Sequence, residues 1–260
     1  MMSYMPGETR DIAHMPRGGF NASCLDRRLQ TDRLEYLDRD DVDHLKRQVV
    51  RSLEVVGSLF GDHQRFARLA LAEVDEVPDP TILELGSGHG ALSRALLENH
   101  PTARVTVTDV EPTSVAAIAA GDLGGHPRAT VREMDATAID APDRSFDLAV
   151  FALSFHHLPP LAASRVFAEG TRVADKLLII DLPRPPAPLH LVQLAAMLPF
   201  APVIPLAHDG VISSLRAYSP SAMRALAAHA DPTIRVELRG GGFGLPLRPN
   251  PQVVVASRRG

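Results

Sequence analysis

A strand, a glycine-rich turn and a helix follow one another between Thr81 and Leu97, and this stretch constrains the fold more than any other. The apolar run TILEL enters the turn GSGHG, and helical spacing begins at Ala91. The first turn of a helix offers unpaired N–H groups and partial positive charge, and glycines let a ligand approach the backbone closely. Three glycines in five residues exceed what an ordinary strand-to-helix turn needs, so we predict a ligand site here.

The glycine spacing admits two kinds of ligand. Gly86, Gly88 and Ala91 fit the G-x-G-x-x-G/A pattern of dinucleotide sites, so the turn alone allows NAD. Glu84 and Gly90 favour another ligand, because the whole string ELGSGHG resembles the first motif of class I S-adenosylmethionine (SAM)-dependent methyltransferases. The resemblance implies SAM as cofactor, with S-adenosylhomocysteine as product. It assigns the cofactor contacts in this motif to Glu84, Gly86, Ser87 and Gly88.

Strands and helices alternate regularly after Thr81, which favours a parallel sheet covered on both faces. The expected strands are 104–109, 130–134, 146–151 and 176–181, and the helices between them are 91–97, 113–120 and 161–173. Two further strands, 234–239 and 252–257, suit an antiparallel hairpin at one edge of the sheet. The resemblance implies a Rossmann-like, doubly wound α/β sheet of seven strands in the order 3-2-1-4-5-7-6, with the last strand antiparallel.

The segments outside the predicted sheet and its helices are expected to form caps over this core. Residues 1–30 show no period and read as a mobile segment, and helices follow from Asp40-Asp41 and over 63–74. We therefore divide the chain into an N-terminal segment and helical cap (1–75) and a core (76–260). The core contains a proline-rich insertion at 182–218 with one apolar helix near 189–200, and an insertion of this length usually covers a site.

Two aspartates follow the second and third predicted strands. Asp109 lies 109 − 86 = 23 residues beyond Gly86, and a carboxylate there can accept both hydroxyls of an adenosine ribose, with Val110 beside it. The alternative for Asp109 is a helix N-cap. Asp135-Ala136 resembles the D-A-x-x-[LI] segment of class I methyltransferases, which implies an adenine contact. The alternative for Asp135 is a residue that only forms a turn.

The string SFDLAVFALSFHHL, residues 145–158, resembles the fourth-strand motif of small-molecule methyltransferases related to the ubiquinone and menaquinone enzymes. The resemblance implies that Phe151 lines the methionine end of the cofactor and that His156 and His157 lie where the methyl group emerges. Histidine can act as a general base near neutral pH, and the resemblance favours His157, which precedes Leu158. A capping or core histidine is the alternative. Adjacent side chains tend to point apart, so we predict no metal site here.

The insertion supplies a second set of candidates. His208, next to Asp209, is a rival base, and Tyr36 is a candidate to close the pocket from the N-terminal side, although a packing role is the simpler interpretation. The apolar residues of the insertion describe a pocket for a hydrophobic small molecule or, equally well, a homodimer interface. They are Leu189, Leu191, Val192, Leu194, Met197, Leu198, Phe200, Val203 and Ile204.

The composition of the chain limits which partners the protein is expected to bind and in which cellular compartment it is expected to act. The net charge of −4 with no basic stripe argues against nucleic acid and against an anionic membrane surface. No run is long enough to span a bilayer, and residues 1–30 lack the apolar core of a secretory signal. Cys24 is the single cysteine, which fits a reducing cytoplasm. We expect a cytoplasmic enzyme without nucleic-acid or membrane partners.

These observations predict methyl transfer from SAM to a hydrophobic, aromatic small molecule, with oxygen favoured over nitrogen or carbon as the acceptor atom. Two alternatives remain open. The first is an NAD(P)-dependent oxidoreductase, although neither Lys46 nor Lys176 has a tyrosine four residues before it. The second is a non-catalytic SAM-binding protein that assembles with a partner.

Overall fold

One seven-stranded sheet organises the protein in the computed structural model, which describes residues 11–39, 41–241 and 250–258. The strand order is β3-β2-β1-β4-β5-β7-β6, and β7 is antiparallel to both of its neighbours. The other pairings are parallel. The predicted topology is therefore confirmed. The strands are β1 (Thr81–Leu85), β2 (Arg104–Asp109), β3 (Ala129–Glu133), β4 (Phe146–Ala152), β5 (Ala174–Asp181), β6 (Ile234–Gly240) and β7 (Gln252–Arg258).

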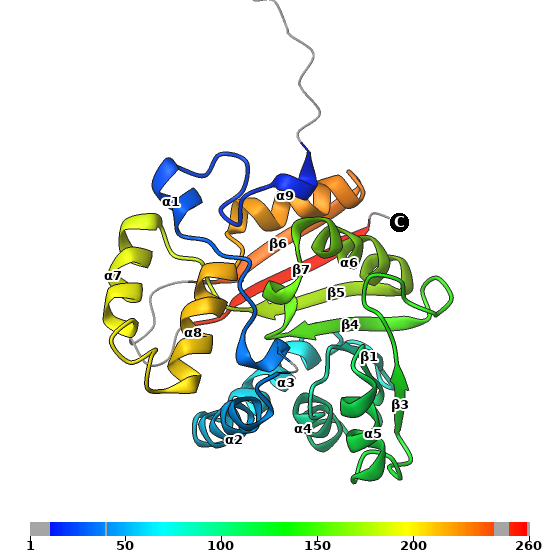
Figure 1. The fold of residues 1–260 in the computed structure, drawn as a ribbon. Helices are drawn as coiled ribbons and strands as arrows, with labels where there is room; N and C mark the ends of the chain where they lie inside the picture. Colours follow the sequence, from blue (N-terminus) through cyan, green and yellow to red (C-terminus); the bar gives the residue numbers. More distant parts are fainter. Residues whose placement is uncertain (1–10, 40, 242–249, 259–260) are drawn as a thin grey trace, which may run out of the picture.

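Helices cover both faces of the sheet, as Figure 1 shows. One buried cluster packs α6 and α9 against the sheet, and the other packs α3, α4 and α5 against the opposite face. The central strands are buried on both sides, which is why they read as unbroken apolar runs. The α-helices are α1 (Cys24–Arg28), α2 (Asp43–Phe60), α3 (Asp62–Leu71), α4 (Ala91–Asn99), α5 (Pro112–Ala120), α6 (Pro160–Val173), α7 (Ala187–Met197), α8 (Pro205–Arg216) and α9 (Pro220–Ala230).

The N-terminal segment is more structured than the sequence predicts. Residues 11–30 contain the 3₁₀ helix η1 (Ile12–His14) and α1, and Ile12, Met15 and Arg17 are buried against the core. A second 3₁₀ turn, η2 (Tyr36–Asp38), packs on α8. In Figure 1 the blue chain between α1 and α2 runs alongside α8. For residues 11–30 the expectation of a mobile segment was wrong, because these side chains find partners far away in sequence.

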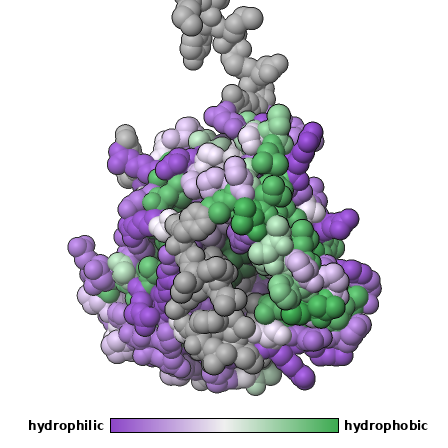
Figure 2. Space-filling model, turned by 90° about the vertical axis from the view of Figure 1, so that its left-hand side faces the viewer, coloured by the Kyte–Doolittle hydropathy of each residue, from purple (hydrophilic) through white to green (hydrophobic). Residues whose placement is uncertain are grey.

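The insertion holds two helices rather than one. The sequence predicted α7 but not α8, which begins at Pro205, where the ring suits a first helical turn, and continues through Gly210. The predicted pocket lining also needs correction. Six apolar residues at or after α7 are 45–75% exposed, on the face with the green patches in Figure 2. These residues are Leu191, Val192, Leu198, Phe200, Val203 and Ile204. Among the described residues, no helix is long and apolar enough to cross a membrane.

Candidate functional site

The glycine turn after β1 adopts a conformation that only glycine takes easily. Gly86 and Gly88 have φ values of +62° and +57°, in the left-handed region. A Cβ at Gly86 would lie 2.7 Å from the Phe151 ring and 2.9 Å from Ser154 Oγ, so the turn packs closely on the end of β4. A Cβ at Gly88 would meet nothing within 4 Å. Gly90 also has a positive φ, +72°, and a Cβ there would press on the Leu123 side chain. The turn therefore has two packed glycines, and Gly88 is the one that faces open space.

The residues around the turn leave polar groups available. Asp109 Oδ2 accepts the Gly88 N–H at 2.8 Å, and Oδ1 accepts the Glu111 N–H at 2.9 Å. A carboxylate offers about four acceptor positions, so Asp109 can still accept hydroxyl groups. Ser87 Oγ is buried and has no hydrogen-bond partner in the described part of the chain. The unpaired Ser87 hydroxyl and the fixed Asp109 carboxylate can bind the polar groups of a nucleoside cofactor, and no side chain at Gly88 blocks its approach.

Glu84, predicted above to contact the cofactor, is engaged within the protein. Its side chain is buried beneath the turn, and its carboxylate accepts a hydrogen bond from Ser93 Oγ of α4. Burial raises the pKa of Glu84 to about 7, although the Ser93 contact opposes this effect. Glu84 thus joins the strand to the helix that follows the turn.

The other predicted cofactor residues lie at the same edge of the sheet in different environments. Val110 is 63% exposed, directly after β2. Asp135 Oδ1 accepts both the N–H and the hydroxyl of Thr137 at 2.8 Å, which is the turn-forming role given above as the alternative. Ala136 packs against the core cluster, and Phe151 is buried with its ring edge on Phe155. Of these residues, Phe151 lies directly against the glycine turn.

The two histidines after β4 converge instead of pointing apart. They lie in the 3₁₀ turn η3 (Phe155–His157), which brings their ring centroids to 4.4 Å. His156 Nε2 lies 3.5 Å from Glu35 Oε1, and His157 Nε2 lies 3.8 Å from Glu35 Oε2. The geometric reason for predicting no metal was therefore wrong, because the backbone turns between the two residues. The three ligand atoms lie within 4.8 Å of one another.

A carboxylate holds the opposite side of each imidazole ring. His156 Nδ1 lies 2.7 Å from Asp181 Oδ1, at the end of β5. His157 Nδ1 lies 2.9–3.0 Å from the carboxylate of Asp38. Burial alone would lower the pKa of His156, but Asp181 and Glu35 raise it to about 9. Burial would raise the pKa of Asp38, and His157 and Arg216 instead hold it at about 2.

Buried donors fix the backbone of η3. The Arg17 guanidinium donates to the carbonyl oxygens of His156 (3.0 Å) and Leu158 (2.9 Å) and lies 4.4 Å from the Tyr218 ring centroid. The Tyr218 hydroxyl donates to the Leu158 carbonyl as well. Leu153, just before η3, has a φ of +58°, which is strained for a residue other than glycine. The loop after β4 is thus held in one conformation from several sides.

His208 lies in a different setting, on the wall of a cavity of about 570 Å³. Its ring stacks on Tyr36 with centroids 4.1 Å apart, and its Nδ1 lies 2.9 Å from Asp209 Oδ1. Asp209 also accepts the Tyr36 N–H at 2.9 Å, and burial raises its pKa above the ordinary range. The cavity is lined by Arg33, Leu34, Asp38, Arg39, Asp41, His208 and Ile212.

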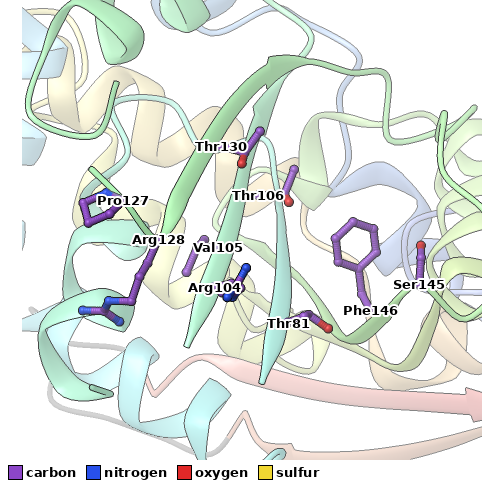
Figure 3. Close-up of a pocket in the computed structure, with 9 residues that line it drawn as sticks. All are labelled: Thr81, Arg104, Val105, Thr106, Pro127, Arg128, Thr130, Ser145 and Phe146. Carbon is purple, nitrogen blue, oxygen red and sulfur yellow. The ribbon is translucent and has the colours of Figure 1, made fainter. Parts of the chain in front are cut away.

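This cavity is linked through Asp38 and His157 to the loop that follows the carboxyl end of β4. Asp38 lines the cavity and contacts His157, and η3 follows Ser154, whose hydroxyl lies 3.4 Å from the Gly86 carbonyl oxygen. A second cavity, of about 210 Å³, lies where β1 to β4 begin, between Arg104, Arg128 and Phe146 (Figure 3). Ligands of open α/β sheets bind at the carboxyl ends of the strands, so the cavity beside His208 is the candidate for the substrate.

Sequence reasoning missed several residues that build this edge. Glu35, Asp38 and Asp181 supply the carboxylates around the histidines, and Arg17 holds the backbone of η3. Asp181 was visible as the last residue of a predicted strand. The others lie more than 50 residues from η3 in sequence and belong to no motif, so only the folded structure reveals them.

Known proteins resemble the region around the turn and β4. The family described as "Methyltransferase domain" matches residues 82–176. A demethylmenaquinone methyltransferase of Thermus thermophilus is 28% identical over 193 residues, 69% of this chain and 86% of that protein. The predicted resemblance to class I SAM-dependent methyltransferases of the small-molecule type is confirmed, with SAM as the cofactor. This assignment replaces the oxidoreductase alternative.

Other known proteins match shorter or longer parts of this chain. A malonyl-[acyl-carrier protein] O-methyltransferase of Geobacter sulfurreducens is 34% identical over 105 residues, which span 40% of this chain and 38% of that protein. The plantazolicin methyltransferase BpumL, solved with a pentazolic desmethylPZN analogue and S-adenosylhomocysteine, superimposes with a TM-score of 0.64 at 13% identity. It covers 90% of this chain and 97% of its own. At that identity the likeness shows the fold.

Proposed function

We propose that the methyltransferase binds SAM over the glycine turn and transfers its methyl group to an oxygen of a small aromatic acceptor in the cavity beside His208. The bound cofactor supplies a methyl group already activated on a sulfonium. Gly86, Ser87, Gly88 and Asp109 would hold its nucleoside, with Val110, Asp135 and Ala136 beside them. Phe151 would limit its methionine end.

The observation that carries the catalytic assignment is the His208–Asp209 pair on the cavity wall. Asp209 engages Nδ1 of the ring, which leaves Nε2 as the nitrogen that accepts a proton from an acceptor hydroxyl. The imidazolium formed then lies against the carboxylate of Asp209. His157 fits this role less well, because its Nδ1 contacts Asp38 and its Nε2 faces Glu35. We therefore propose His208 as the base and place His156 and His157 in a separate cluster.

The residues that line the cavity also indicate which kind of acceptor would bind there. Leu34 and Ile212 offer apolar contacts and Arg33 offers a cationic one, whereas Arg39 is paired with Asp41. These groups favour an aromatic acceptor that carries a polar or anionic substituent. The names of the relatives agree with such chemistry: one acts on demethylmenaquinone, and the other methylates an oxygen.

The test is methyl transfer from radiolabelled SAM to a panel of phenols, catechols, hydroxyquinones and aromatic acids. We expect at least one acceptor to be methylated on oxygen, and we expect His208→Gln to lower kcat by about 10²–10⁴-fold with unchanged SAM affinity. His229→Gln, at an exposed position on α9, is the matched control and should leave kcat unchanged. Full turnover by His208→Gln would remove the base assignment, and no transfer to any acceptor would contradict the proposed substrate class.

A further inference from the structure

The Glu35, His156 and His157 side chains, called here the Glu35 cluster, have no part in the methyl transfer proposed above. Their three ligand atoms converge on one point from segments that are 121 residues apart in sequence. Glu35 is 2% exposed and His156 is 3% exposed. Glu35 Oε1 also accepts the Ser213 hydroxyl at 2.8 Å, which fixes the carboxylate in place. Two of the three members are thus buried, His157 is 22% exposed, and the carboxylate is held from outside the cluster.

We propose that the Glu35 cluster binds a divalent first-row transition-metal ion such as Zn²⁺. Ligands of a tetrahedral ion with bonds of about 2.0–2.1 Å lie about 3.3 Å from one another. The separations of 3.5 and 3.8 Å between Glu35 and the two Nε2 atoms approach that value. Two imidazoles with one carboxylate suit zinc, iron or manganese better than calcium or magnesium, which prefer oxygen ligands.

The carboxylates behind the two imidazole rings are placed as they usually are around metal-binding histidines. Such a histidine normally shares its other ring nitrogen with a carboxylate or carbonyl oxygen, which fixes the tautomer and the ring orientation. Here both rings do so, His156 with Asp181 and His157 with Asp38. Both Nδ1 atoms are therefore engaged, and both Nε2 atoms point to the same carboxylate.

The buried charges and the unpaired ring nitrogen of the Glu35 cluster also indicate that a cation binds there. The carboxylates of Glu35 and Asp181 are both buried beside His156, and buried charges normally have partners of opposite sign. His156 Nε2 is buried and has no hydrogen-bond partner among the described residues. A proton on His156 would supply one positive charge, and a divalent ion would supply two and use the free Nε2. The proton is therefore the competing occupant that the experiment must distinguish.

The test uses the full chain, stripped with a chelator and titrated with Zn²⁺ by calorimetry and with Co²⁺ by visible absorption. We expect one ion per chain with a dissociation constant below about 1 μM, and a Co²⁺ spectrum of four- or five-coordinate geometry. His156→Gln and Glu35→Gln should each weaken binding by roughly 100-fold or more. Asp181→Asn should weaken it by about 10–100-fold through the ring orientation. His229→Gln should bind as the original chain does.

Two outcomes would overturn the proposal. One is a folded original chain, verified by circular dichroism, that shows neither stoichiometric Zn²⁺ binding nor a Co²⁺ spectrum. This measurement uses the original chain, so it decides the question even if a variant fails to fold. Its outcome would mean that a proton on His156, and not a metal ion, occupies the cluster. The other is equal affinity in the His156→Gln and His229→Gln proteins, which would place the ion elsewhere. Because binding is the readout, failure here leaves the methyl-transfer proposal intact.

Discussion

The glycine turn and the Glu35 cluster lie at the same edge of the sheet but are built in opposite ways. The turn comes from five consecutive residues whose backbone conformation and packing are set locally, with Phe151 and Asp109 as supports. The cluster joins η2, η3 and the end of β5, and Arg17 and α8 hold it together. The proposed cofactor site therefore depends on glycine conformations, whereas the Glu35 cluster depends on long-range buried polar contacts.

The largest expected effect is at the turn. Gly86→Val places a β-branched side chain at φ +62° and against Phe151 and Ser154. We expect a loss of roughly 3 kcal/mol in the free energy of unfolding and no measurable SAM binding. Urea unfolding and calorimetry check both quantities. SAM affinity within threefold of the original would show that the turn is not the cofactor site.

Arg17→Met probes the other region. The substitution removes the hydrogen bonds to the His156 and Leu158 carbonyl oxygens, and the Leu158 oxygen keeps the Tyr218 hydroxyl as a donor. We expect a loss of about 3 kcal/mol in stability with SAM affinity preserved, because the Arg17 guanidinium donates to the loop after β4 and, among the described residues, makes no hydrogen bond to the glycine turn. The measurements are urea unfolding and calorimetry at a temperature where the variant is folded. A parallel loss of SAM affinity would mean that the two regions are coupled.

Glu84 gives the turn region a pH dependence. Its pKa is raised to about 7 when folded, so the native state binds more protons than the unfolded state between about pH 4.5 and 7. The favourable contribution is complete below pH 4.5 and is lost as the pH rises through 7. We expect the free energy of unfolding to fall between pH 5 and 8 by up to about 3 kcal/mol more in the original chain than in Glu84→Gln. Parallel profiles would contradict this assignment.

The smallest effect concerns the cavity. Tyr36→Leu removes the ring that stacks on His208 and keeps an apolar side chain. We expect about 1 kcal/mol less stability, a loss of kcat below tenfold and unchanged SAM affinity. Steady-state kinetics with an acceptor from the panel provides the measurement. A loss of kcat as large as that of His208→Gln would instead give Tyr36 a direct role.

The two regions also differ in how far the sequence predicts them. Strand β2 was predicted to the residue, and the sheet order that the family resemblance implied was correct. The central strands β1 and β5 were found because strands buried on both faces carry nearly continuous apolar runs. The glycine turn was found because its residues are consecutive. The sequence missed the convergence of His156 and His157 on Glu35, since it depends on a 3₁₀ turn and on a partner 121 residues away. It also missed α8, and the exposed side chains of α7 had been expected to line a pocket.

The most direct test of the account is the effect of one methyl group at Gly88 on cofactor affinity. Gly88 and Gly61 have φ values of +57° and +63°, and a Cβ at either position meets no atom within 4 Å. Gly88→Ala and Gly61→Ala should therefore lose similar stability, about 1 kcal/mol each. Calorimetric titration with S-adenosylhomocysteine should show at least roughly tenfold weaker binding for Gly88→Ala and none of this loss for Gly61→Ala. Equal affinities in the two variants would contradict a cofactor site over the turn.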